Sequence, residues 1–430
     1  MSEIPMEKTS KGNVLAIGVC FALFFMIAFV TNFAGAMGPI LKNQFGASNM
    51  ASQFGSAANF FAYFFMGIPG GLILKRKGYK FTSLLAAAVG FFGVGVQLAA
   101  AYCGKESAFT VYETGAFIAG FSMCLLNLVV NPLLNTLGGE GNKGNQLVQF
   151  GCSLNSIGAT LSPMILGWLV GGEVSKAHVG QAVPALVIAM AIFAVAFLVI
   201  SFSKIPEPHM ETAAERANRT SVIADILATL KFRHFTLGAI AIFTYIVIES
   251  GIPNMAMLYM TAEKIGEVKN PAYVGSVVAG SVCGAYWFCM MIGRLVGGLI
   301  GGKVSSRVQI TFCATMGIVC MIAAMFLPVQ MVTVFGKQFP LAMCAMVLAG
   351  LCTSVMWGGI FNMAAEGLGK YVPMGSGIFM AMVVGGLLLP IQGFVADKVG
   401  ILNSYWMTVA LFAYVLFYAL IGSRVSKRAE

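Results

Sequence analysis

One acidic residue lies deep within a long apolar segment of this sequence. Glu249 occupies the run from Phe243 to Asn254, whereas most of the 16 Asp and Glu residues lie in loops or at helix ends. A charge at the centre of a membrane helix costs about 2.5–3.5 kcal/mol on insertion scales, so such residues are rare and are functional candidates by default. We interpret Glu249 as a functional residue; the alternative is a neutral side chain that bonds a neighbouring helix. Pro253 removes a backbone donor four residues later, and we expect the helix to break there and expose carbonyl groups.

Amide side chains follow one face of a predicted helix and continue in the next apolar segment. Asn127, Asn131 and Asn135 are spaced at i, i+4 and i+8, and Gln149 and Asn155 come after them. Residues four apart share one face of a helix. Amides both donate and accept hydrogen bonds, as sugar hydroxyl groups do. The pattern favours a cavity for a polar solute, although asparagines can also simply join membrane helices.

The second half of the chain adds further substrate-binding candidates, which are Asn254, Trp357, Asn362 and Gln392. An aromatic face stacks on the C–H side of a sugar ring. For any single Trp, anchoring at the membrane interface is the alternative interpretation.

The sequence argues against an enzyme, a metal site and a bound cofactor. His178, His209 and His234 lie in loops or at a helix edge, and the ten cysteines include no CxxC pair. The segment 297–304 resembles a phosphate-binding loop but lacks its Ser or Thr and the preceding strand. The net charge of +10 is spread over short loops without a base-stacking motif, so no nucleic-acid partner is expected.

The elements that position these side chains are predicted to be membrane helices. The chain is 58% hydrophobic and 10% charged, whereas soluble domains carry about 25% charged residues. Crossing a bilayer takes roughly 20 mostly apolar residues. The sequence predicts an all-α integral membrane protein with twelve transmembrane helices, at about 13–40, 50–75, 80–102, 109–137, 144–171, 180–203, 234–262, 271–302, 308–329, 338–366, 374–398 and 400–423.

The helices are predicted to form two six-helix bundles, 13–203 and 234–423, joined by a polar linker 204–233 and flanked by tails 1–12 and 424–430. With both termini in the cytoplasm, cytoplasmic segments hold 18 of the 26 Lys and Arg residues and the opposite loops hold seven. This excess follows the positive-inside rule.

A weak internal repeat supports two equivalent halves. Gly70-Gly71-Leu72-Ile73 precedes Lys75, and Gly297-Gly298-Leu299-Ile300 precedes Lys303 about 228 residues later. Pro163 and Pro390 repeat at nearly the same offset. Two matches at one offset indicate pseudo-symmetric bundles.

Several motifs resemble the fucose–galactose–glucose permease group of the major facilitator superfamily. They are Asn131-Pro132 with Leu137-Gly138, Asn155-Ser156-Ile157-Gly158-Ala159, Ile292-Gly293-Arg294, Ile360-Phe361, Gly367-Leu368-Gly369, Gly375-Ser376-Gly377, Val384-Gly385-Gly386 with Pro390, and Gly393-Phe394-Val395-Ala396-Asp397. They occur in the order of that group.

This resemblance implies a monosaccharide transporter of the bacterial inner membrane that works as a monomer by alternating access, with the solute site between the halves. It implies a polar role for Asn32 and gating roles for Arg294 and Asp397. Two acidic positions that the group's proton symporters use correspond here to Gly35 and Asn127, neither of which can titrate. Glu249 is then the remaining group for coupling to H⁺ or Na⁺.

Several alternatives stay open from the sequence. The transporter could be an uncoupled sugar facilitator, or it could carry another small polar solute such as an acidic sugar or an amino acid. An intramembrane enzyme would need a paired acid, a metal triad or a Ser/His arrangement. A channel fits the two-bundle repeat poorly.

Overall fold

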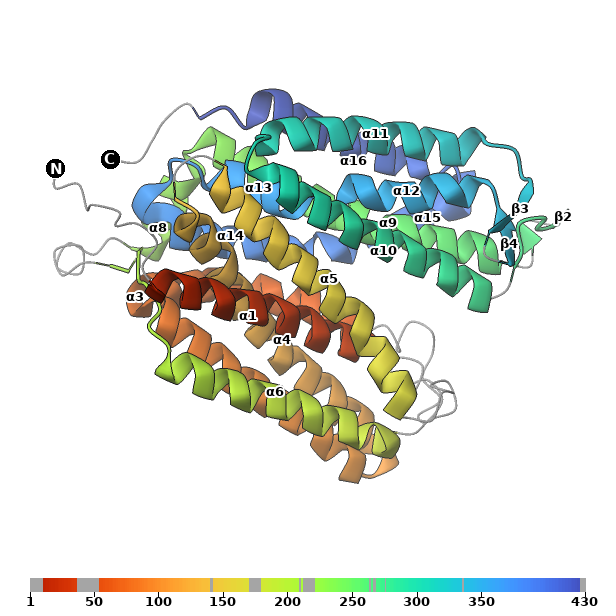
Figure 1. Ribbon diagram of the computed structural model, residues 1–430. Coiled ribbons are helices and arrows are strands. Elements are labelled where there is room, and N and C mark those ends of the chain that lie inside the picture. The colour runs from red at the N-terminus through yellow and green to blue at the C-terminus, as the bar shows by residue number, and fades with distance from the viewer. Residues whose placement is uncertain are drawn as a thin grey trace. The chain divides into compact units, whose positions relative to one another are not determined.

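The structure is a computed structural model that describes residues 11–36, 54–139, 142–169, 179–208, 210–211, 221–262, 264–265, 268–274, 276–334 and 336–425. These residues are mostly helical, with two short β-hairpins (Figure 1). The chain divides into two compact units, each with its own core. Unit 1 contains the described residues of Met1–Gly139, Ile157–Val222 and Lys370–Met380, and unit 2 those of Glu140–Ser156, Ile223–Gly369 and Ala381–Glu430.

Unit 1 is built around α4. Its elements are α1 (Lys11–Ala36), α3 (Phe54–Ala99), η2 (Ala100–Tyr102), α4 (Lys105–Leu137), the second part of α5 (Lys143–Leu169), η4 (Val179–Ala182), α6 (Val183–Phe202) and most of α14 (Val372–Ala381). Helix α4 packs against both α3 and α1. Its residues Leu125, Leu126 and Leu128 are completely buried.

Unit 2 is built around α9. Its elements are the first part of α5, α8 (Val222–Leu230), α9 (Arg233–Thr261), β1 (Lys264–Ile265), β2 (Val268–Lys269), α10 (Ser276–Gly301), α11 (Ser306–Phe326), β3 (Met331–Val334), β4 (Lys337–Pro340), α12 (Ala342–Thr353), α13 (Met356–Ala365), η6 (Met382–Leu388), α15 (Leu389–Val399), α16 (Tyr405–Phe417) and the π-helical turn η7 (Tyr418–Gly422). The short turn η5 (Gly369–Tyr371) leads into α14. Helix α9 packs against α10, α12, α13 and α16.

The twelve predicted helical segments all correspond to helical structure. Ten helical stretches of the described chain are long and apolar enough to cross a membrane. Helix α3 forms one of these stretches but covers two predicted helices, and α5 corresponds to a further predicted helix outside the ten. The prediction of an all-helical membrane protein is confirmed.

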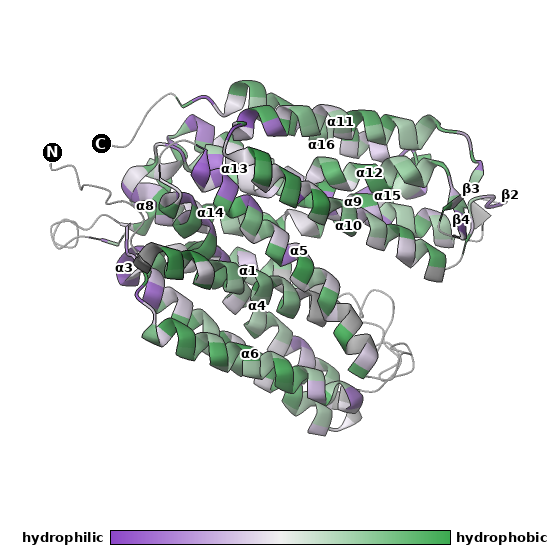
Figure 2. Ribbon diagram, in the orientation of Figure 1, coloured by the Kyte–Doolittle hydropathy of each residue, from purple (hydrophilic) through white to green (hydrophobic). Residues whose placement is uncertain are grey.

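Hydrophobic residues make up most of the helices, as the hydropathy colouring shows (Figure 2), and many of the large ones are exposed. On α3, Phe92 is 64% exposed, and on α10 Leu299 is 68% exposed. Large exposed apolar areas are rare on soluble monomers. In a membrane protein these side chains face the hydrocarbon of the bilayer. Contact with hydrocarbon carries no free-energy penalty for an apolar side chain.

The two predicted helices within α3 meet at Gly78 without an intervening loop. Gly78 has a φ of 82°, a conformation that side-chain-bearing residues rarely adopt. The Glu207 carboxylate accepts hydrogen bonds from the backbone N–H groups of Tyr79 and Lys80, the latter at 2.9 Å. A carboxylate at this position satisfies N–H groups that begin a helix and have no helical partner.

The hairpin β3–β4 was not predicted; residues from 338 onward were expected to be helical. Its strands pair antiparallel from Met331–Pro340 to Val334–Lys337. The β-branched run Val332-Thr333-Val334 suits a strand, and Gly336 supplies a φ of 74° for the turn. A second hairpin, β1–β2, joins α9 to α10.

Two predictions about helix continuity were wrong in opposite directions. Helix α9 continues through Pro253, where a break was expected. The segment 338–366 was expected to be one helix, but α12 ends at Thr353 and α13 begins at Met356. The predicted bundle boundaries, linker and tails stay predictions.

Candidate functional site

Glu249 on α9 and Arg294 on α10 form an ion pair inside unit 2. Arg294 Nη2 lies 3.1 Å from Glu249 Oε1, and the two side chains are only 9% and 16% exposed. The Tyr245 hydroxyl, one helical turn before Glu249, donates to the same carboxylate oxygen at 2.6 Å. The carboxylate is thus held by one cation and one hydroxyl.

The rest of the Arg294 guanidinium group binds other elements of unit 2. Nη1 donates to Ser156 Oγ at 2.7 Å and to the Cys152 carbonyl at 3.4 Å, both on α5. Nε donates to the Ser354 carbonyl at 3.4 Å, in the interruption between α12 and α13. Arg294 therefore links the Glu249 carboxylate on α9 to the first part of α5.

Pro253 acts on this site through the backbone. Because proline has no N–H group, the carbonyl of Glu249 lacks its usual helical donor. The Tyr286 hydroxyl of α10 donates to that carbonyl at 3.1 Å and lies 3.1 Å from Thr353 Oγ1. The helix does not break, and the carbonyl that the proline leaves without a helical donor is bonded to Tyr286 instead of exposed.

Two sequence candidates lie close to the ion pair. Gln149 on α5 is buried and donates to the Val355 carbonyl at 2.9 Å, which is again in the α12–α13 interruption. Its Oε1 atom is buried and has no hydrogen-bond partner among the described residues. The Trp357 ring lies 6.4 Å from the Tyr245 ring, centroid to centroid. An unpaired amide oxygen offers an acceptor for a hydroxyl group.

The other candidates in unit 2 are dispersed. Gln392 donates to Thr408 Oγ1 at 3.1 Å, and Asn362 donates to Ser306 Oγ at 2.9 Å. Each of these bonds joins two helices. Asn155 is half-buried, while Asn254 and Asp397 are exposed.

The asparagine stripe of α4 forms a buried chain in unit 1. Asn127 donates to the Tyr63 hydroxyl at 2.7 Å and to the Met123 carbonyl at 3.1 Å. Asn131 is completely buried and donates to the Asn127 carbonyl at 2.9 Å. The sequence placed these amides together but did not identify Tyr63 as their partner. Asn32 and Gly35 belong to α1, and their surroundings lie outside the described residues.

A second acid lies within a membrane helix and was not predicted from the sequence. Glu113 lies in α4, inside the apolar span that begins at Ser107. Both of its carboxylate oxygens are buried and have no hydrogen-bond partner among the described residues. The sequence carries a signal for it, because residue 113 lies within the helix predicted at 109–137. That signal is weak, since Glu113 is only four residues from the predicted helix start and acids are common at helix ends.

Within the described part of the chain, no group of three or more His, Cys, Asp or Glu side chains could hold a metal ion. The ten cysteines are all free thiols. The polar residues gathered around Glu249 and Arg294 can bind protons, cations or hydrogen-bonding solutes.

Relatives of known name align with nearly the whole chain. The glucose/galactose transporter of Brucella abortus biovar 1 (strain 9-941) is 26% identical over 425 residues, which is 97% of each chain. The putative glucose/galactose transporter of Helicobacter pylori (strain ATCC 700392 / 26695) is 27% identical over 434 residues, 97% of this chain and 98% of the other. The L-fucose-proton symporter of Escherichia coli (strain K12) is 22% identical over 442 residues, 97% of this chain and 95% of that protein.

Solved structures share the fold. The E. coli fucose:proton symporter in its outward conformation matches with a TM-score of 0.81 and 19% identity, over 96% of this chain and 100% of that chain. A proton:xylose symporter matches with a TM-score of 0.71 and 11% identity, over 98% of each chain. The family model described as Major Facilitator Superfamily matches residues 19–390. The predicted fold and the resemblance to sugar permeases are thereby confirmed, and the chain belongs to the Major Facilitator Superfamily.

Proposed function

We propose that this chain transports a monosaccharide, such as a hexose, deoxyhexose or amino sugar, by alternating access and in symport with protons. The proposal of a sugar is supported by the full-length relatives named glucose/galactose transporter and L-fucose-proton symporter. The proposal of coupling is carried by one observation, the buried Glu249–Arg294 pair that reaches α5 through Ser156.

The substrate is held by side chains that both donate and accept hydrogen bonds. The proposed set is Asn32, Asn127, Asn131, Gln149, Asn155, Asn254, Trp357, Asn362 and Gln392. Gln149 is the strongest member, because its amide oxygen is buried and unpaired among the described residues and the Trp357 ring is close to the pair. Neutral amides suit a neutral sugar better than an acidic one, which would need a cation that is not already paired.

Proton coupling works through the charge of Glu249. With Glu249 ionised, the guanidinium of Arg294 is compensated in an environment of low dielectric constant. When Glu249 binds a proton, Arg294 becomes a buried charge without a counterion, which is costly. Arg294 then moves toward water or another acceptor.

Movement of Arg294 releases α5. Its Nη1 atom is the donor to Ser156 Oγ and to the Cys152 carbonyl, so a shift of the guanidinium breaks both bonds. Of the hydrogen bonds described above, only the one from Gln149 to the Val355 carbonyl then still holds the first part of α5. Proton binding thus favours the conformation in which this part of α5 is free to move. In this role Arg294 gates the site, and we assign a second gating role to Asp397 on α15.

The test uses purified protein in proteoliposomes, a panel of labelled glucose, galactose, fucose and xylose, and an imposed pH gradient. Wild-type protein should accumulate at least one of these sugars and acidify the lumen. Glu249→Gln should retain counterflow exchange and lose accumulation by at least tenfold. Glu113→Gln is the matched control, because it neutralises a membrane acid that has no arginine partner among the described residues.

Three results would contradict the proposal. Sugar equilibration without proton movement in the wild type would identify a facilitator. Loss of accumulation in Glu113→Gln with retention in Glu249→Gln would move the coupling to α4. Exchange of an amino acid or acidic sugar, but of no neutral sugar, would identify another solute.

We further propose that the chain lies in a bacterial inner membrane with both termini in the cytoplasm, and that one chain is the unit of transport. The distribution of Lys and Arg over the loops supports this orientation. We expect an enzymatic activity to be absent, as in other transporters.

A further inference from the structure

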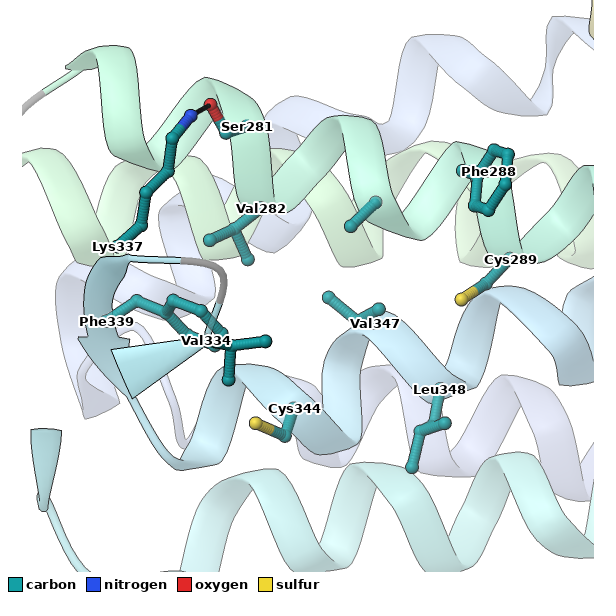
Figure 3. A pocket seen from close by; sticks show the side chains of 11 residues that line it. Ser281, Val282, Phe288, Cys289, Val334, Lys337, Phe339, Cys344, Val347 and Leu348 are labelled. Carbon is teal, nitrogen blue, oxygen red and sulfur yellow. Dashed lines mark hydrogen bonds between the residues drawn. The ribbon is translucent and has the colours of Figure 1, made fainter. Parts of the chain in front are cut away.

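A pocket of about 540 Å³ lies in unit 2, and neither Glu249 nor Arg294 lines it. It lies between α10 and α12, and the β3–β4 hairpin closes one end (Figure 3). Pockets of about 300–1,000 Å³ hold small ligands. None of the residues that line it is among those proposed to bind the substrate, couple the proton or gate the site.

The walls of the pocket are apolar and open to the membrane. Phe288 on α10 is 52% exposed and Leu348 on α12 is 51% exposed, and Val282 and Val347 line the space between the helices. Within α10, only 28% of the apolar span Val278–Gly301 is buried. Exposed apolar residues on a helix of this length and composition suit contact with lipid, so an acyl chain can reach the pocket.

One end of the pocket is polar and positively charged. Lys337 on β4 reaches toward α10, where its Nζ atom donates to Ser281 Oγ at 2.6 Å (Figure 3). Lys337 is exposed, and among the residues that the structure describes no carboxylate forms an ion pair with it. The ammonium group retains two N–H donors for a further acceptor.

We propose that this pocket binds an anionic phospholipid, with an acyl chain between α10 and α12 and the phosphate on Lys337 and Ser281. The apolar walls match a hydrocarbon chain, and each buried methylene group contributes about 0.8 kcal/mol. The single cation matches the negative headgroup. Ser281 and Phe288 are seven residues apart on α10, about 10 Å along the helix, so the chain runs along two helical turns.

The pocket does not suit the other available ligands. A sugar would leave its hydroxyl groups without partners along the apolar walls. A second copy of the chain would cover the exposed apolar residues but would also bury Lys337 without a counterion among the described residues, which is unfavourable.

The test measures lipid retention by the purified full-length protein in native mass spectrometry, with dioleoyl-phosphatidylglycerol and dioleoyl-phosphatidylcholine as probes. Wild-type protein should retain more of the anionic lipid. Lys337→Gln should lower the retention of phosphatidylglycerol about fivefold, as expected for one lysine near an anionic surface. It should leave phosphatidylcholine unchanged. Lys269→Gln, on the exposed end of β2, is the matched control and should behave as wild type.

A second variant tests the acyl-chain part of the pocket. Ala285→Phe places a ring in the space between α10 and α12 and should lower the retention of both lipids. Equal retention of the two lipids by the wild type, or the same loss in Lys337→Gln and Lys269→Gln, would overturn the proposal. Dimeric protein that becomes monomeric in Ala285→Phe would show instead that a second copy occupies the pocket.

Discussion

A buried guanidinium group needs acceptors for its N–H groups, and Arg294 finds them on three elements of unit 2. The Glu249 carboxylate supplies the charge, Ser156 the shortest bond at 2.7 Å, and the Ser354 carbonyl a third contact at 3.4 Å. This arrangement is stable only while Arg294 and its acceptors are all present, because removing one partner leaves a buried polar or charged group without its hydrogen bond or counterion.

The first prediction concerns the strength of this pair. Arg294→Gln leaves Glu249 as a buried charge without its cation and should lower the free energy of unfolding by about 3–5 kcal/mol. Glu249→Gln should have a similar effect. The double variant should lose clearly less than the sum of the two, as measured by denaturant unfolding in detergent.

Arg307→Gln provides the control, since Arg307 on α11 is exposed and its replacement should change stability by less than about 0.5 kcal/mol. Additive losses in the double variant would show that Glu249 and Arg294 do not stabilise each other.

At this scale, the sequence identified the residue types but only some of the partners. Glu249 and Arg294 were both singled out, yet their pairing depends on the packing of α9 against α10, which no local pattern specifies. Tyr245 could have been found, because it lies one helical turn before Glu249. Tyr63 and Tyr286 could not, since each comes from a different helix.

Among the elements, the joint at Gly78 connects three parts of unit 1. Glu207, in the segment after α6, accepts the N–H groups of Tyr79 and Lys80, and Lys80 Nζ donates to the carbonyls of Ser201 and Ser203 at 2.8 and 3.0 Å. The end of α6 is thereby fastened to the bend in α3.

The second prediction is a pH dependence of this joint. Burial raises the pKa of Glu207 above its ordinary value of 4.5, while the two backbone donors and Lys80 act in the opposite direction with smaller effect. The folded protein then binds more protons than the unfolded chain above pH 4.5. Its free energy of unfolding should therefore fall, relative to that of Glu207→Gln, as the pH rises from about 4.5.

Unfolding curves of both proteins at several pH values check this sign. If the wild type instead gains stability relative to Glu207→Gln as the pH rises, the backbone donors and Lys80 lower the pKa of Glu207 more than burial raises it.

The third prediction concerns the contact between α3 and α14 in unit 1. A Cβ atom on Gly71 would lie 2.7 Å from the Pro373 carbonyl oxygen and 3.1 Å from Gly377 Cα. Gly71→Ala should force these helices apart and cost about 1–3 kcal/mol. Gly18→Ala, where nothing lies within 4 Å, is the control and should keep or slightly raise the thermal midpoint, because Ala favours a helix over Gly. Equal midpoints for the two variants would show that the close approach does not stabilise unit 1.

The sequence predicted the existence of these elements better than their interruptions. Long apolar blocks located every membrane helix, because burial in lipid leaves a strong compositional signal. The stop at Thr353 could not be seen, since only Ser354 favours a turn there and neither proline nor glycine occurs between Thr353 and Met356. The break expected at Pro253 did not occur, because a hydroxyl group from α10 satisfies the freed carbonyl.

For the whole molecule, family and fold follow from features that extend over the full chain. Twelve apolar blocks, a repeat near 228 residues and an ordered set of weak motifs all indicate the same superfamily. The identity of the sugar does not follow in this way, because amide side chains bind many hydroxyl-rich solutes.

The fourth prediction concerns orientation in the membrane. Cys103 is exposed between η2 and α4, in a connection predicted to face away from the cytoplasm. A membrane-impermeant maleimide should label it in intact cells, and Cys103→Ser should remove that label. Labelling that requires broken cells would reverse the proposed topology.

Pro253 has a consequence for tolerance to substitution. Elsewhere in a helix, replacing proline restores a backbone donor and is expected to help. Here the restored N–H group would compete with Tyr286 for the Glu249 carbonyl, and the phenol would lose its partner in α9. Pro253 thus weakens α9 but allows α10 to bind it through Tyr286. A substitution of Pro253 that would stabilise α9 alone is therefore unfavourable for the packing of α9 against α10.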